Sequence, residues 1–186
     1  MKIAVNPPRA LAENDNRDSF DCGRKSLNNW FRRHAWANHV SNVSRVTVLT
    51  AAGSGRIVGY FTLSAAQIER SFLPKPQQRN RPDPVPAILL GQLAVDKAYQ
   101  GQGHAVDLLL HAYKRALVAS ETVGCMALIT HPVDDAVRGF YARWGFQDLP
   151  FDLRRAMIVR IEDLARYLRV GLEMIPFEVK PLRCVG

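Results

Sequence analysis

The chain has 186 residues, of which 47% are hydrophobic and 23% charged, and its formal net charge is +8. This length fits one compact domain, and the composition is ordinary for a soluble globular protein. Three widely spaced cysteines without Cys/His metal spacing exclude a disulfide framework or a zinc module, which favours a reducing cytoplasm. No apolar run reaches the length of a membrane span or of a signal peptide.

The positive charge is concentrated in residues 22–81. That span holds ten basic residues and one acid, Glu69, giving +9, whereas the rest of the chain has 15 basic and 16 acidic residues, giving −1. Such asymmetry is typical of a surface that binds a polyanion. A solvated basic face that serves solubility is the alternative, and charge alone does not decide between the two.

The first half of the chain predicts a strand, a helix and a hairpin before a proline-rich loop. Residues 1–5 predict a short strand that a Pro-Pro pair ends. Residues 24–39 predict one helix, because apolar side chains recur at helical spacing. Residues 44–52 and 56–68 are rich in β-branched and aromatic residues around a Gly-Ser-Gly turn, which predicts a hairpin. Five prolines in 71–87 predict a long extended loop.

The second half predicts strands and helices in alternation, without an internal repeat or a domain linker. The order of elements indicates a mixed α/β fold with one central sheet. The run AILLGQLAV is apolar almost throughout, as expected of a strand buried on both faces. We expect strands at 87–95, 125–130 and 155–161, and helices at 104–119, at 134–143 and from 162 onward.

A glycine-rich turn connects the strand at 87–95 to the helix that follows it. Glycines at 101 and 103 allow the backbone to turn tightly and to expose its N–H groups. The helix N-terminus adds unpaired donors and a positive dipole end, so the turn suits a phosphate or pyrophosphate. The Walker pattern is absent, and Val106 replaces the last glycine of a Rossmann fingerprint. A connection that merely needs glycine is the alternative.

The turn sequence QGQGHA at 100–105 resembles Q/R-x-x-G-x-G/A, the acetyl-CoA pyrophosphate loop of the GNAT acetyltransferases. Ala105 stands where glycine is commoner, and the pattern permits it. The resemblance implies the GNAT fold, a mixed central β-sheet flanked by helices with a bulged strand before the loop. It also implies acetyl-CoA as co-substrate and no metal. The cofactor-binding residues that it implies are Leu93, Ala94, Val95, Gln100, Gly101, Gln102, Gly103, His104 and Ala105.

A second family motif is the tyrosine of FYARWGF at 140–146, which precedes an x-x-x-G-F turn. The resemblance implies that Tyr141 is the catalytic residue. Acetyl transfer leaves a thiolate that needs a proton, and a phenol with a reference pKa near 10 suits that leaving group. The alternative is that Tyr141 is only a core aromatic beside Phe140 and Phe146.

A closer resemblance, over about residues 17–161, is to the acetyltransferase toxins of type II toxin–antitoxin modules. It rests on FDCG at 20–23, LNxWFxxxAxxN at 27–38, RPxPxP at 81–86 and LGxLAVD at 90–96. It implies transfer of acetyl from acetyl-CoA to the α-amino group of aminoacyl-tRNA, which blocks translation in the cytoplasm. It further implies a ribbon-helix-helix antitoxin as partner and allows a homodimer.

The resemblance divides the chain into a single acetyltransferase domain, 1–170, and a C-terminal extension, 171–186. Residues 174–179 of the extension are apolar enough to pack on the domain or on a partner. Within the domain, no general base stands out, since Glu69, Asp96 and His131 are candidates by position only. A base is not strictly needed, because the amine of an aminoacyl ester is less basic than a free α-amino group, whose pKa is about 7.7–8.0.

The basic span acquires a role if the substrate is tRNA. Guanidinium groups bind phosphates bidentately, and aromatic rings stack on bases. Trp36 is a candidate for stacking on the terminal base, with core packing as the alternative, and the same basic helix also suits an acidic antitoxin tail. His34, His39, Cys22 and Cys125 show no catalytic or metal-binding pattern. The residues expected to hold tRNA are Arg24, Arg32, Arg33, Arg79 and Arg81.

Two other functions compete with a tRNA-acetylating toxin. One is an ordinary GNAT N-acetyltransferase that acts on a protein or a small-molecule amine. The other is a GNAT scaffold that binds nucleic acid or an antitoxin without turnover, against which the glycine loop and Tyr141 both argue. An adjacent reading frame for a small ribbon-helix-helix protein would favour the toxin.

Overall fold

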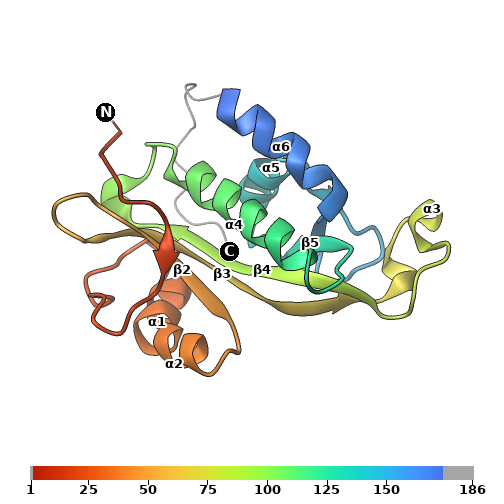
Figure 1. Cartoon of the computed structure of the whole chain (residues 1–186), viewed down its shortest axis with the longest axis horizontal. Helices are drawn as coiled ribbons and strands as arrows, with labels where there is room; N and C mark the ends of the chain where they lie inside the picture. Colours follow the sequence, from red (N-terminus) through yellow and green to blue (C-terminus); the bar gives the residue numbers. More distant parts are fainter. Residues whose placement is uncertain (1, 174–186) are drawn as a thin grey trace.

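One twisted sheet of seven strands runs through the molecule, with helices on both of its faces (Figure 1). The computed structural model describes residues 2–173. The sheet order is β1-β2-β3-β4-β5-β7-β6, and only the β4–β5 pair is parallel. The strands are β1 (Arg9–Ala10), β2 (Arg45–Thr50), β3 (Ile57–Ile68), β4 (Val85–Val95), β5 (Ala127–Thr130), β6 (Gln147–Asp148) and β7 (Met157–Arg160).

The helices pack on the two faces in two groups. Helices α4, α5 and α6 bury their apolar sides against one face, where Phe61, Leu93 and Leu108 are fully buried. Helices α1 and α2 cover the other face around Phe31 and Tyr60. The helices are α1 (Lys25–Arg33), α2 (Ala35–Val40), α3 (Lys75–Gln78), α4 (His104–Ser120), α5 (Asp135–Arg143) and α6 (Ile161–Glu173), with 3₁₀ turns η1 (Arg70–Phe72) and η2 (Lys97–Tyr99).

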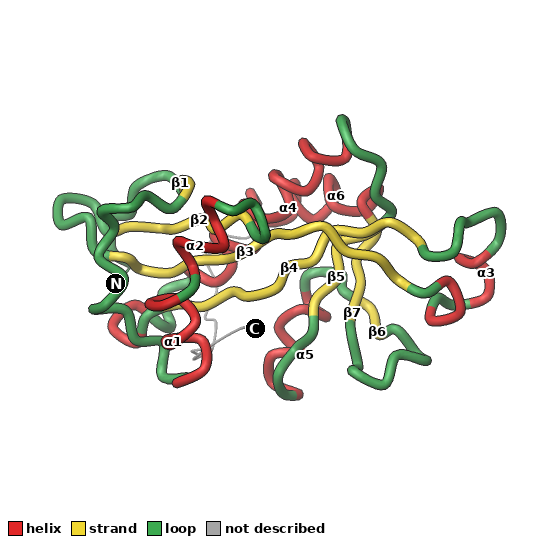
Figure 2. The backbone as a smooth tube through the Cα atoms, turned by 90° about the horizontal axis from the view of Figure 1, so that it is seen from below, coloured by secondary structure: helices red, strands yellow, loops and turns green. Residues whose placement is uncertain are grey.

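Strands β4 and β5 pair over a short length and then diverge. Their register joins Ala87–Leu89 to Ala127–Ile129, although β4 continues as far as Val95. Figure 2 shows β5, β7 and β6 fanning away from the long β3–β4 ribbon. Among the described residues, one edge of β4 therefore has no neighbouring strand beyond Leu89.

The first 40 residues differ from the sequence-based prediction in two places. Of the strand expected at 1–5, the described residues 2–5 form no regular strand, since Val5 makes only an isolated bridge to Ala51 and β1 follows the two prolines. The helix expected at 24–39 is two helices that meet at His34. After this break, the His39 Nδ1 accepts a hydrogen bond from the Val46 N–H at 3.0 Å, a contact between α2 and β2 that helical periodicity does not predict.

The hairpin is confirmed as β2 and β3, whereas the loop expected at 71–87 is shorter and partly helical. Lys75–Gln78 form one helical turn, which tolerates proline at its start because the first N–H groups have no helical partner. Strand β4 begins at Val85, two residues before its expected start.

The C-terminal half follows the prediction closely, with two differences. The expected helices and strands are confirmed as α4, β5, α5, β7 and α6, within three residues at the ends that the structure describes. Strand β6 was not predicted, because a two-residue edge strand has too few residues for a periodic signal. The helical spacing of apolar residues at 104–119 predicts that Leu117 faces inward with Leu108 and Ala116, but Leu117 is only partly buried.

Gly59 is where β3 and α4 come closest, and we expect its replacement to destabilise the protein. A Cβ at this position would lie 2.7 Å from the Ala94 carbonyl oxygen and 2.8 Å from Leu108 Cδ1. Gly59→Ala should therefore lower the free energy of unfolding by about 1–3 kcal/mol through overpacking. Gly139→Ala is the matched control, because this exposed helical glycine has open space and alanine should stabilise it by about 0.5–1 kcal/mol. Urea denaturation of both variants tests the contrast, which equal midpoints would contradict.

Candidate active site

The turn before α4 gathers unpaired backbone donors. Gly101 and Gly103 have φ values of 78° and 86°, in the left-handed region that glycine favours. No hydrogen bond between described residues uses the backbone N–H groups of residues 101–105. These N–H groups lie at the N-terminal, positive end of the 17-residue helix α4, so the turn is suited to bind an anion.

Side chains of the same turn fix its shape. The Gln100 amide donates to the carbonyls of Cys22 and Val95 at 3.1 and 2.9 Å. The Gln102 side-chain oxygen accepts from the Ile3 N–H at 2.9 Å. Both glutamines thus hold the loop from outside, and its anion-binding capacity comes from the backbone.

Strand β4 presents backbone groups to the open side of the sheet. Its register with β3 skips one residue at Gly91, which is the bulge expected before the loop. The Asp96 N–H donates to the Val58 carbonyl at 2.9 Å, and bonded pairs alternate along an antiparallel ladder. The backbone groups of Ala94 therefore pair with those of Tyr60 in β3. The backbone groups of Leu93 and Val95 point the other way, to the edge of β4 beyond its pairing with β5. Of the three β4 residues predicted to bind the cofactor, these two are placed to do so.

Tyr141 lies where β4 and β5 separate. Its side chain is fully buried, and its ring packs on Phe140 and Phe146 at centroid distances of 5.3 and 4.9 Å. Its hydroxyl has no hydrogen-bond partner among the described residues. The hydroxyl of Thr130, the last residue of β5, donates to the Leu90 carbonyl at 3.0 Å, so it ties the two strands together where they part.

Burial raises the pKa of Tyr141 above its usual range, and the neighbouring Thr130 hydroxyl opposes the shift only in part. The phenol therefore keeps its proton at neutral pH. A buried hydroxyl without a partner is destabilising by about 1–3 kcal/mol, so its presence calls for a role other than packing. The ring is a core aromatic, as the alternative interpretation held, but its hydroxyl has no hydrogen-bond partner among the described residues.

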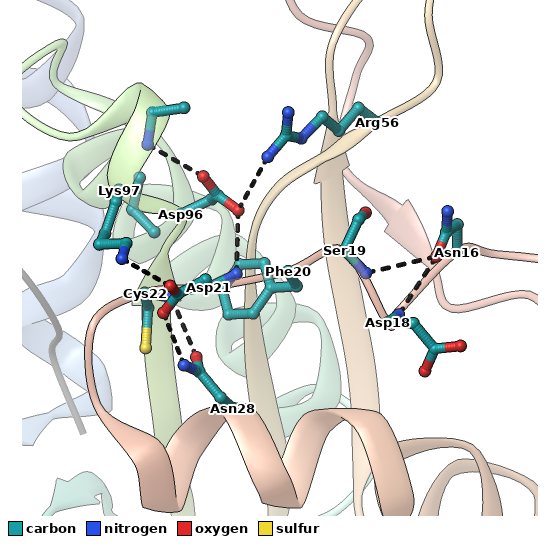
Figure 3. Close-up of polar contacts among 12 residues, drawn as sticks. Asn16, Asp18, Ser19, Phe20, Asp21, Cys22, Asn28, Arg56, Asp96 and Lys97 are labelled. Carbon is teal, nitrogen blue, oxygen red and sulfur yellow. Dashed lines mark hydrogen bonds and ion pairs between the residues drawn. The ribbon is translucent and has the colours of Figure 1, made fainter.

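Asp96, one of the three candidate bases, is a structural residue. It is 2% exposed and accepts hydrogen bonds from the N–H groups of Asp21 and Ala98, and Arg56 lies 3.6 Å from it (Figure 3). Next to it, Asp21 pairs with Lys97 at 2.6 Å, and this ammonium, followed by the Gly23 N–H, lowers the pKa of Asp21 to about 2. The segment at 20–23 is thus bonded to the end of β4.

The other two candidate bases lie in different settings. Glu69 is exposed on the ribbon formed by β3 and β4. His131 follows Thr130 at the end of β5, and its Nε2 is 4.0 Å from Asp152. Burial, followed by the charge of Arg154, lowers the pKa of His131, so its imidazole is neutral at neutral pH. Of the three, only His131 combines a neutral basic nitrogen with a place at the strand end where Tyr141 lies.

The structure separates the five arginines that we expect to hold tRNA into two groups. Arg24, Arg32 and Arg33 lie on or beside α1, whereas Arg79 and Arg81 lie beside α3 at the far tip of the β3–β4 ribbon (Figures 1 and 2). One group therefore extends from one end of the molecule and the other from the opposite end. The long hairpin that divides them is a tertiary feature that a charge count does not contain.

Two of these five arginines already have partners. Arg24 forms an ion pair with Asp134, whose other oxygen caps α5 through the Val137 N–H. Arg32 donates to the Phe20 carbonyl. Sequence reasoning missed Asp134, although an aspartate directly before a helix is a common N-cap. The three arginines without a side-chain partner among the described residues are Arg33, Arg79 and Arg81, all exposed.

Trp36 packs against the core and does not project into solvent as a free stacking surface would. It is half-buried against the core under α1 and stacks on His39 at a centroid distance of 5.9 Å, which confirms the packing interpretation. The helical spacing of apolar residues at 24–39 predicts His34 on the apolar side of one helix, but His34 is exposed at the break between α1 and α2. Within residues 2–173, no group of three His, Cys, Asp or Glu side chains is arranged to hold a metal ion.

A groove lies elsewhere, beside α4. It encloses about 600 Å³, and neither Tyr141 nor the glycine turn lines it. Its floor is apolar, with Leu63, Ala65 and Ile88. Around the floor stand three arginines and two histidines, and none of its lining residues is acidic; the basic ones are Arg9, His39, Arg45, His111 and Arg115.

The chain matches a known family over the part that carries this site. The family model described as an acetyltransferase (GNAT) domain matches residues 44–148. This protein is a GNAT acetyltransferase. A tRNA-acetylating toxin of Mycobacterium tuberculosis is 37% identical over 152 residues, which cover 82% of this chain and 90% of that one.

Solved structures agree with the assignment. AtaT complexed with acetyl-methionyl-tRNAfMet has a TM-score of 0.80 and 26% identity, covering 88% of this chain and 98% of that chain. A structure of AtaTR bound with acetyl-CoA has a TM-score of 0.74 and 25% identity, covering 87% and 96%. The mixed sheet, the bulged β4 and the turn before α4 therefore belong to a GNAT acetyltransferase, an enzyme that transfers acetyl to an amine. Within the described residues, no helix is both long and apolar enough to cross a membrane.

Proposed function

We propose that this GNAT acetyltransferase is a toxin that transfers acetyl from acetyl-CoA to the α-amino group of aminoacyl-tRNA and so blocks translation. The observation that carries the chemistry is the buried hydroxyl of Tyr141, which has no partner within residues 2–173. The edge of β4 beyond Leu89 and the N–H groups of residues 101–105 likewise have no partner in that part of the chain. The substrate class rests on the likeness to the tRNA-acetylating toxin and to AtaT, together with the basic span.

The residues fit acetyl-CoA without any metal. The N–H groups of residues 101–105 suit its pyrophosphate. The backbone groups of Leu93 and the N–H of Val95, which point to the open edge of β4, suit its pantetheine arm, whereas the Val95 carbonyl already accepts from Gln100. Acetyl-CoA, when bound, supplies an activated thioester. Tyr141 then holds the proton that the departing thiolate takes, and its raised pKa keeps that proton available throughout the neutral range.

Arg33, Arg79 and Arg81 are the best-placed candidates for phosphate contacts, since their side chains have no partner among the described residues. Arg24 can contact a phosphate only if its ion pair with Asp134 breaks, and Arg32 only if its hydrogen bond to the Phe20 carbonyl breaks. The two groups lie at opposite ends of the ribbon, so the tRNA that we propose as substrate would bridge a long surface or two copies of this chain. A homodimer is therefore part of the proposal.

The direct test of the function is acetylation of purified aminoacyl-tRNA. Incubation with labelled acetyl-CoA should place the label on the amino acid, and Tyr141→Phe should not. Label on a protein or a small amine, with none on tRNA, would favour the ordinary N-acetyltransferase instead. Binding of tRNA without any transfer would favour a scaffold without turnover.

Salt dependence tests the role of the arginines. Each phosphate contact contributes about 0.7–0.9 to the slope of log affinity against log salt concentration. Arg79→Glu/Arg81→Glu should therefore weaken tRNA binding and flatten the slope by about 1.4–1.8 units, without changing affinity for acetyl-CoA. Arg166→Glu/Arg169→Glu is the control, because both arginines are exposed on α6. Equal slopes for Arg79→Glu/Arg81→Glu and the wild type would mean that these two arginines do not contact tRNA.

We further propose a ribbon-helix-helix antitoxin as partner and the cytoplasm as the site of action, as expected for an enzyme that acts on aminoacyl-tRNA. The acid-free groove beside α4 has the charge and the apolar floor that suit an acidic segment of such a partner. The single-domain division at 170 stays a proposal, and residues 174–179 lie outside the described residues.

A further inference from the structure

Lys2 lies over the anion-binding turn, although it is 99 residues or more away from it in sequence. Its ammonium nitrogen is 3.8 Å from the position that a Cβ on Gly103 would occupy. The neighbouring Ile3 N–H donates to the Gln102 side chain, which holds the N-terminal segment against the turn. The side chain of Lys2 is 38% exposed, so a ligand in the turn would reach it.

Asp107 holds the Lys2 ammonium in this position. Its carboxylate oxygens are 2.9 and 2.7 Å from the Lys2 Nζ, and His104 Nδ1 is 3.2 Å from the same carboxylate. Burial would raise the pKa of Asp107, but the contacts with His104 and Lys2 outweigh it, so the pKa falls and the carboxylate stays charged.

An anionic carboxylate in the first turn of α4 opposes the binding of another anion at the same helix end. If the turn bound pyrophosphate through its backbone alone, Asp107 would not increase its affinity for pyrophosphate. The presence of Asp107 is accounted for if it positions a cation, because an ammonium group has three donors and can bridge a carboxylate and a phosphate.

We propose that Lys2 is a further cofactor-binding residue: its ammonium group, positioned by Asp107, contacts the pyrophosphate of acetyl-CoA over Gly103. This inference rests on the proposed use of the turn for acetyl-CoA. It adds a charged ligand from the N-terminal segment to a site otherwise made of backbone donors.

Calorimetry of the full chain with three ligands tests the contact. Lys2→Gln should weaken acetyl-CoA binding by about 5- to 30-fold, the range for a partly exposed charge-assisted hydrogen bond. The loss should be equal for acetyl-dephospho-CoA, which lacks the 3′-phosphate, and absent for S-acetylpantetheine, which lacks all phosphates. Lys2→Arg should restore most of the affinity. Lys114→Gln removes the same charge from an exposed position ten residues along α4 and should have no effect.

The Asp107→Asn background separates direct contact from mere neutralisation of Asp107. If Lys2 contacts the phosphate, Lys2→Gln still weakens binding in that background. If Lys2 only cancels the charge of Asp107, Lys2→Gln/Asp107→Asn binds as tightly as Asp107→Asn, and the proposal is overturned. An unchanged affinity of Lys2→Gln, or an equal loss with S-acetylpantetheine, also overturns it. Failure of the wild type to bind acetyl-CoA would instead refute the proposed function.

Discussion

Tyr141→Phe should lower the acetylation rate by about 10²- to 10⁴-fold, the range for loss of a general acid. The substitution keeps the buried ring and removes only a hydroxyl that has no partner among the described residues. Because an unsatisfied buried hydroxyl is destabilising, the variant should unfold at the same or a higher temperature. Its affinity for acetyl-CoA should change little. The measurements are single-turnover rates, thermal unfolding and calorimetry on the same preparation.

Comparing the acetylation rate with the thermal stability makes this result informative. If a residue serves only the core, its truncation lowers both the stability and the activity of the protein. Tyr141→Phe should lower the activity without lowering the stability. A rate equal to wild type would mean that water or another group protonates the thiolate. The pH profile provides a second check: since burial raises the pKa of Tyr141, the wild-type rate should not fall as pH rises to about 10, the ordinary pKa of tyrosine.

Gly103→Glu should abolish detectable binding of acetyl-CoA, a loss of at least about 100-fold. The backbone at Gly103 has φ of 86°, which strains any other residue by about 1–3 kcal/mol. The new carboxylate would also point to Lys2 Nζ and occupy the space where an anion binds. Repulsion between this carboxylate and the pyrophosphate should exceed the strain, because both lie at the same helix end.

Gly103→Ala separates the two effects. It introduces the same backbone strain without a charge, and its Cβ would meet only the Lys2 ammonium nitrogen, at an ordinary contact distance of 3.8 Å, so its loss of affinity should be about 10-fold or less. Calorimetry with acetyl-CoA measures both variants, and circular dichroism confirms that each is folded. Wild-type affinity in a folded Gly103→Glu protein would refute the assignment of this turn to acetyl-CoA.

Together these variants test two parts of one site that different elements supply. The turn belongs to the β4–α4 connection, and Tyr141 belongs to α5, on the other side of the gap between β4 and β5. Strands β4 and β5 diverge beyond Leu89, and the Tyr141 hydroxyl has no partner among the residues that the structure describes. A substitution that closed the gap would therefore damage both functions, whereas Tyr141→Phe and Gly103→Glu should each damage one.

Local sequence determined the second half of the fold and the identity of the site's main parts. A buried strand, two glycines and a helix are contiguous at 87–119, so their chemistry is contained in short-range signals. The same holds for Tyr141, whose helix, turn and aromatic neighbours lie within a few residues of it. The glycine turn and the tyrosine could therefore be proposed as site residues before any contact was known.

Tertiary structure alone decided what depends on long-range pairing. The β3–β4 ribbon carries Arg79 and Arg81 away from α1, so one run of charge in the sequence becomes two separate surfaces. Asp96, a candidate base by position, is committed to Asp21, 75 residues away, and Arg24 is paired with Asp134, 110 residues away. Lys2 reaches Gly103 for the same reason. Periodicity and charge counts describe neighbours along the chain, whereas these roles arise from neighbours in space, which the packing of the sheet brings together.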